Sequence, residues 1–120
     1  MDTARKAELR TYELTYILSG SLTDQDVEKA KAEIEPLLKR ASAQVVKTED
    51  WGKRPLAYII THGGKKQTEG YYVFLVIKMP ADKASDLDRE MYLNGRVMRH
   101  LLLVSEEVTV EEQPAKEKEG

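Results

Sequence analysis

Four stretches of the chain have the composition of strands. Residues 11–18, TYELTYIL, are rich in Tyr, Thr, Ile and Leu, which favours a strand. A period of two places four of their side chains on one face: Tyr12, Leu14, Tyr16 and Leu18. Residues 71–79, YYVFLVIKM, are almost continuously apolar, as expected of a central strand that is covered on at least one face. Residues 97–104, VMRHLLLV, form the last predicted strand.

The second predicted strand is interrupted in its middle. Residues 43–51, AQVVKTEDW, suit an edge strand, and LAYII at 56–60 resumes the extended pattern after Gly52, two cations and Pro55. This break indicates a corner or bulge in a long edge strand, where Gly52 relieves backbone strain and Pro55 removes a donor that an edge can spare. GGKKQTEG at 63–70 then predicts a flexible hairpin loop.

Two amphipathic helices are predicted between these strands. Thr23 is the expected N-cap of the first, followed by acids that suit the positive end of a helix. Its apolar stripe recurs at spacings of three and four: Val27, Ala30, Ile34, Leu37, Leu38 and Ala41. Pro36 costs an interior helix about 3 kcal/mol, which predicts either a kink or two shorter helices. In 81–93, ADKASDLDREMYL, the stripe consists of Ala84, Leu87 and Met91.

The order β-α-β-β-α-β predicts an α+β fold, the ferredoxin-like sandwich, in which a four-stranded antiparallel sheet carries two helices on one face. The first and third strands are expected at its centre. We expect one domain over 11–104, preceded by an N-terminal extension at 1–10. Residues 105–120 form an acidic tail with little apolar mass, which we expect to be disordered when the protein is alone.

Composition excludes several classes of protein. The 120 residues fit one domain, and the absence of cysteine excludes disulfides, thiolate catalysis and cysteine-based zinc sites. With only His62 and His100, we expect no metal site. No apolar run approaches the roughly 18 residues that span a bilayer. The N-terminus lacks the apolar segment of a secretory signal, so we expect a cytoplasmic protein without a membrane partner.

Charge does not decide between the remaining classes. The chain carries −2 overall, and residues 105–120 hold six glutamates and two lysines, so residues 1–104 carry +2. Nucleic-acid binders are usually more basic than this. The modest positive charge of the predicted domain neither supports nor excludes binding to RNA.

The motifs argue against an enzyme. The chain lacks a G-x-S-x-G elbow, a phosphate-binding Walker loop and a G-x-G-x-x-G fingerprint. Its acids gather on the outer faces of the predicted helices and in the tail, where a solvated surface explains them. We therefore expect no catalytic residue, no cofactor and no small-molecule substrate.

Two kinds of RNA-binding surface remain. Residues 69–74, EGYYVF, match the signature of an RNA-recognition sheet only in part, because Glu69 replaces a cation and Tyr72 a small residue. Aromatic residues at alternate strand positions are more often core or cross-strand pairs. The second kind uses loops and strand ends, where three basic groups lie: Lys53 with Arg54, Lys65 with Lys66, and Arg96 with Arg99. Solubilising charge is the alternative interpretation of each group.

The interrupted strand carries a family resemblance. Residues 50–60, DWGKRPLAYII, resemble the D-W-G-[RK]-R-x-L-A-Y-x-I stretch of the bacterial small-subunit ribosomal protein six family. Tyr12-Glu13, Gly70-Tyr71-Tyr72 and Met79-Pro80 resemble further family motifs, and Asn94 to Arg99 resembles its N-D-x-V-x-R. The resemblance spans Arg10 to Val104. This sequence departs from the family pattern at three positions, Pro55, Ile59 and Gly95.

The resemblance implies a structural component of the bacterial small ribosomal subunit, ribosome-bound and without catalytic activity. Such proteins bind the central domain of 16S ribosomal RNA together with ribosomal protein eighteen, with which they form a heterodimer. The residues that it implies for RNA or partner binding are Arg10, Tyr12, Lys53, Arg54, Arg96 and Arg99. The rival hypothesis is a non-ribosomal ferredoxin-like domain, either a ligand-binding regulator or a self-associating sheet.

Overall fold

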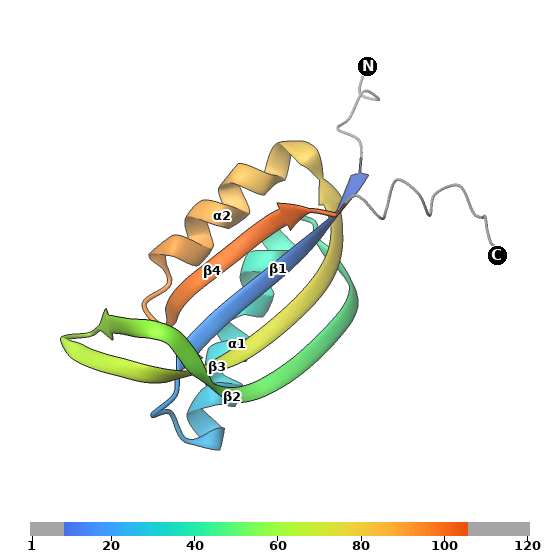
Figure 1. Ribbon diagram of the computed structural model, residues 1–120. Coiled ribbons are helices and arrows are strands. Elements are labelled where there is room, and N and C mark those ends of the chain that lie inside the picture. Colours follow the sequence, from blue (N-terminus) through green and yellow to red (C-terminus); the bar gives the residue numbers. More distant parts are fainter. Residues whose placement is uncertain (1–8, 106–120) are drawn as a thin grey trace, which may run out of the picture.

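The computed structural model describes residues 9–105. Its elements in chain order are β1 (Leu9–Ser19), α1 (Asp24–Arg40), β2 (Gln44–His62), β3 (Lys65–Pro80), the short 3-10 helix η2 (Ala81–Lys83), α2 (Ala84–Leu93) and β4 (Val97–Val104). The strands form one antiparallel sheet in the order β2-β3-β1-β4, and both helices pack on the same face of it (Figure 1). The predicted ferredoxin-like fold, with β1 and β3 at the centre, is confirmed.

The domain boundaries are tested only in part. β1 begins at Leu9, so Leu9 and Arg10 belong to the sheet rather than to the predicted N-terminal extension. At the other end, the backbone amide of Ser105 donates to the Thr11 carbonyl at 2.9 Å. The rest of the predicted extension, 1–8, and of the acidic tail, 106–120, lies outside the described residues.

The hydrophobic core lies between the sheet and the two helices. The four side chains predicted on one face of β1 are all buried there, and they pack against the apolar stripes of α1 and α2. The third strand contributes Val73, Leu75, Ile77 and Met79. Burial, assisted by the negative charge of Asp50, raises the pKa of the Tyr16 phenol well above its ordinary value.

Helix α1 begins as predicted but is not divided. The Thr23 hydroxyl accepts a hydrogen bond from the Asp26 amide at 3.2 Å, which confirms the N-cap. The helix then continues through Pro36 to Arg40, so the predicted alternative of two shorter helices is wrong. The carbonyl that loses its partner belongs to Ala32, and both Ala32 and Pro36 are exposed, so water can satisfy it. Leu37 and Leu38 follow directly and anchor the next turn in the core.

The hairpin between β2 and β3 is more ordered than its sequence predicts. Only Gly63 and Gly64 form the turn, and Lys65 and Lys66 pair with His62 and Thr61 in the sheet. The predicted flexible loop over 63–70 is therefore wrong. Both glycines have positive φ angles, 62° and 79°, a combination that suits two-residue hairpin turns because it matches the twist of the strands.

Strand β2 is the predicted long edge strand with an irregular middle. Its register against β3 shifts at three places: between Val45 and Lys47, between Asp50 and Gly52, and between Pro55 and Ile60. Gly52 has a φ of 78°, and Pro55 lies opposite Glu69 on the outermost strand of the sheet. The predicted bulge at Gly52 and the edge position of Pro55 are confirmed.

Replacing Gly52 with alanine is expected to lower the free energy of unfolding by about 1–2 kcal/mol, because a side chain disfavours this left-handed backbone conformation. No heavy atom lies within 4 Å of the added Cβ, so the cost is conformational and not steric. Gly95 offers the same open space without a positive φ. Gly95→Ala is the matched control, and urea denaturation should show no loss for it. Equal losses at both positions would contradict this account of the bulge.

Candidate RNA and protein interface

The sheet face opposite the helices is not covered by any other part of residues 9–105, and we call it the open face. Its side chains alternate with those of the core, so they point away from the helices. They are Glu13, Thr15 and Ile17 of β1, Tyr72, Phe74 and Val76 of β3, Leu101 and Leu103 of β4, and Trp51 of β2.

The open face is largely apolar, with the polar side chains of Glu13 and Thr15 on its central strand between apolar side chains of β3 and β4. Leu101, Thr15 and Phe74 form one cross-strand row, and Leu103, Glu13 and Val76 form the next. Leu101 leaves 55% of its surface exposed, and Leu103 about as much. Several exposed apolar side chains gathered on one face of a protein are typical of a protein interaction site.

Trp51 extends the open face onto the edge strand. Its ring stacks on Phe74 with centroids 5.2 Å apart and planes at 9°, and it lies 6.5 Å from the ring of Tyr72. The indole N–H donates to Glu49 Oε1 at 2.8 Å. This hydrogen bond, with a further one from Lys47, lowers the pKa of the Glu49 carboxyl. The three stacked rings form a flat platform whose geometry is held before any partner arrives.

Arg54 lies at the margin of this platform. Its Nε donates to the Trp51 carbonyl at 3.1 Å, and its guanidinium lies 5.8 Å from the centroid of the Trp51 ring. Lys53 is exposed on the edge strand and forms no ion pair with any other described residue. Of the two predicted cations, Arg54 therefore supports the open face directly, and Lys53 points its charge into solvent.

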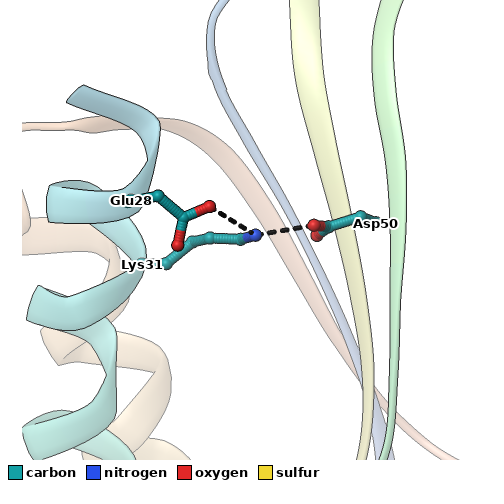
Figure 2. A network of polar contacts seen from close by, with 3 residues as sticks. All are labelled: Glu28, Lys31 and Asp50. Carbon is teal, nitrogen blue, oxygen red and sulfur yellow. Dashed lines mark hydrogen bonds and ion pairs between the residues drawn. The ribbon is translucent and has the colours of Figure 1, made fainter. Parts of the chain in front are cut away.

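Asp50 anchors the edge strand on the other side of the sheet. Lys31 Nζ, on α1, lies 2.6 Å from Asp50 Oδ2 and 3.4 Å from Glu28 Oε2 (Figure 2). Partial burial lowers the pKa of the Lys31 ammonium, but the hydrogen bond to Asp50 and the two negative charges outweigh it, and the pKa is raised. The D-W-G sequence thus has three structural roles: Asp50 ties β2 to α1, Trp51 builds the platform, and Gly52 permits the bulge.

The four remaining predicted site residues lie in different surroundings. Tyr12 is 4% exposed and belongs to the core, so its side chain supports the fold instead of a surface contact. Arg10 is exposed at the start of β1, opposite Met79. Arg96 Nε donates to Glu33 Oε2 at 3.0 Å, which ties the start of β4 to α1.

Arg99 lies on the edge strand β4, at the end of a cross-strand row of the open face. It pairs with Ile17, and Ile17 pairs with Tyr72, which in turn lies opposite Gly52. This row therefore begins with Arg99 at one margin of the open face and ends with the Gly52 bulge at the other margin. Arg54 lies two residues after Gly52. The structure therefore brings Arg54 and Arg99 to a common surface and leaves Arg10, Tyr12 and Arg96 apart from it.

The open face was not among the features predicted from the sequence. A signal was present in the run Leu101-Leu102-Leu103, because consecutive apolar residues on a strand place hydrophobic side chains on both faces of a sheet. Leu102 packs against the core, and its two neighbours are exposed on the other side.

Other kinds of site are not found in the part of the chain that the structure describes. Within residues 9–105, no group of three His, Asp or Glu side chains could hold a metal ion. No helix in that range is long and apolar enough to cross a membrane.

Comparison with known proteins identifies the family. The family model described as Ribosomal protein S6 matches residues 11–103. Small ribosomal subunit protein bS6 of Carboxydothermus hydrogenoformans is 36% identical over 95 residues, which cover 79% of this chain and 95% of that protein. The protein of the same name from Trichormus variabilis is 40% identical over 102 residues, 85% of this chain and 90% of that protein.

A solved structure shows the same fold. The crystal structure of 30S ribosomal protein S6 from Thermotoga maritima superposes with a TM-score of 0.79 at 19% identity, over 92% of this chain and 100% of that one. Because these relatives are structural proteins of the ribosome, the expectation that this chain is not an enzyme is confirmed. On the match over 11–103 and the identity to curated relatives, the chain belongs to the ribosomal protein S6 family of the small ribosomal subunit.

Proposed function

We propose that this small-subunit ribosomal protein binds the central domain of 16S ribosomal RNA together with ribosomal protein eighteen, and that the two proteins form a heterodimer through the open face. Family membership supports a ribosome-bound protein, and a cytoplasmic location goes with it. It also sets aside the rival hypothesis of a non-ribosomal regulator. What we propose beyond family membership is binding to this RNA and to this partner protein.

The observation that carries the proposal is the uncovered apolar surface of the open face. Burial of apolar surface drives association between proteins, and aromatic residues are enriched at the centres of protein interfaces. The stacked rings of Trp51, Tyr72 and Phe74, with Leu101 and Leu103 beside them, supply such a centre. RNA presents charged phosphates, which would lose hydration against these side chains, so a protein suits the open face better.

The cations at the margins of that surface would contact the RNA. Arg54 and Arg99 flank the open face, and Lys53 lies next to Arg54 on the edge strand. Phosphate neutralisation by such side chains gives an affinity that falls with salt. The charge of +2 for residues 1–104 leaves few such contacts, so we expect weak RNA binding by the chain alone. Folded RNA would be recognised by its shape.

A filter-binding titration with a central-domain 16S RNA fragment tests the proposal, with and without ribosomal protein eighteen and at two salt concentrations. We expect weak binding by the isolated chain and much tighter binding by the two proteins together, with a steeper dependence on salt. Tight, sequence-selective binding by the isolated chain, unchanged by the partner, would overturn the proposal.

A further inference from the structure

A cleft lies at the end of α2, apart from the centre of the open face. Its walls come from the last turn of α2, the loop to β4 and the first residues of β4, and His62 of the hairpin closes one side. The His62 ring nitrogen Nε2 lies 3.0 Å from the Gly95 carbonyl oxygen, so a hydrogen bond holds the hairpin against the α2–β4 loop. The cleft has a volume of about 490 Å³, within the range of pockets that hold one small ligand.

Tyr92 lies on the rim of this cleft with its ring in solvent. It is 78% exposed, the highest value among the large hydrophobic side chains in residues 9–105, and Leu93 beside it is also exposed. The side chain therefore has no part in the core, and its ring is free to stack on another flat group. Stacking of a nucleic-acid base on an aromatic side chain contributes about 1–3 kcal/mol.

The charged groups around the cleft leave one guanidinium available. Arg99 lines the cleft, and its hydrogen bond is to the Met98 carbonyl at 3.4 Å, with no carboxylate partner among residues 9–105. Two nearby carboxylates are already engaged. Asp88 Oδ1 lies 2.7 Å from His100 Nε2, and Glu33 bonds Arg96. The Arg99 charge is therefore not neutralised locally and suits a phosphate.

An oriented amide completes the set of recognition groups. Asn94 Oδ1 accepts a hydrogen bond from the Arg96 backbone N–H at 2.8 Å, which fixes the plane of the side chain. Its NH₂ group forms no hydrogen bond with another described residue, and Asn94 lines the cleft. A fixed amide of this kind can donate to an acceptor on the edge of a base.

From these groups we propose that the cleft binds one unpaired nucleotide of RNA, its base stacked on Tyr92 and its phosphate held by Arg99. The inference rests on the proposed function, and it adds a specific RNA contact to it. An aromatic face, a guanidinium and an oriented amide around a space for one small ligand match a splayed nucleotide, since sequence-specific RNA recognition targets such unstacked bases. A protein partner would need the larger continuous surface that the open face provides.

Three variants, each assembled with ribosomal protein eighteen and titrated with the central-domain RNA fragment, test the inference. Tyr92→Ala is expected to weaken RNA binding about 5- to 150-fold, the fold-change that corresponds to the loss of one stacked base. Tyr92→Phe keeps the ring and should stay close to the wild type. Tyr58→Ala removes a similarly exposed tyrosine, 68% exposed on β2 and outside the cleft, and should change little.

A second measurement follows the base directly. A short single-stranded RNA with 2-aminopurine in place of one adenine reports stacking through loss of its fluorescence, and wild type and Tyr92→Phe should quench it more than Tyr92→Ala does. If the Tyr92→Ala heterodimer bound RNA as tightly as the wild type, the inference that the cleft binds a nucleotide would be overturned. The proposed function would still stand. Loss of heterodimer formation in Tyr92→Ala, with the weak RNA binding of the isolated chain unchanged, would assign the cleft to protein and also overturn the inference. Failure of the wild-type heterodimer to bind RNA would overturn both.

Discussion

Replacing Leu101 with aspartate is expected to weaken association with ribosomal protein eighteen by about 100-fold or more, while the chain stays folded. Leu101 is 55% exposed on the open face, in a row with Thr15 and Phe74. In the free chain the new carboxylate stays in water, so little stability is lost. Under a partner it would lose that hydration against apolar side chains, and a loss of about 2.7 kcal/mol already corresponds to 100-fold.

Isothermal titration calorimetry with the purified partner measures this change, and circular dichroism checks that the variant is folded. Ile59→Asp is the matched control, because Ile59 is 57% exposed on the same sheet and lies on the hairpin part of β2, beyond Pro55, and not among the open-face residues defined above. Its dissociation constant should stay close to that of the wild type. Similar losses for both variants would show that negative charge anywhere on the sheet disturbs association, which would contradict the assignment of the open face.

Replacing Leu14 with alanine is expected to lower the free energy of unfolding by about 3 kcal/mol, within the range for deletion of a fully buried leucine. Leu14 is 0% exposed on the central strand β1, between Leu75 of β3 and Leu102 of β4. The loss combines the transfer of the removed methyl groups with the cavity that the neighbours cannot fill.

Urea denaturation at an unchanged m-value gives the size of the Leu14 effect. Leu103→Ala is its control, since Leu103 lies on the opposite face of the same sheet and is half exposed, so we expect a loss below about 1 kcal/mol. If the two variants lost the same stability, the division of the sheet into a core face and an open face would be wrong.

Local periodicity predicted the core better than it predicted the turns. The alternation in 11–18 and the stripes of both helices place inward the side chains that the structure buries, with Ala84 partly buried against the core. The hairpin was misjudged because the composition of GGKKQTEG suggests flexibility, while pairing with β2 orders everything after the two glycines. The alternative of two shorter helices was wrong because the cost of Pro36 depends on whether the carbonyl that it leaves without a partner can meet water. The burial of that helix face decides this, and the local sequence does not.

The candidate site was less predictable than the fold. A nearly continuous apolar strand such as 71–79 predicts a sheet that is covered on one or both faces, but it does not say which face the helices take. The predicted site therefore consisted mainly of cations, and it did not include the exposed leucines of β4 or the stacked platform at Trp51. Tyr12 was included through the family resemblance, although its place in the alternation of β1 already put it on the core face.

Hydroxyl-radical footprinting of the chain, free and in complex with ribosomal protein eighteen, tests most directly whether the open face is the protein interface. Oxidation of Trp51, Phe74, Leu101 and Leu103 should fall several-fold in the complex. Tyr58, on the same sheet but outside the open face, is the internal reference and should react as before. Protection confined to the helix side of the molecule, with the four open-face residues as reactive as in the free chain, would contradict the account.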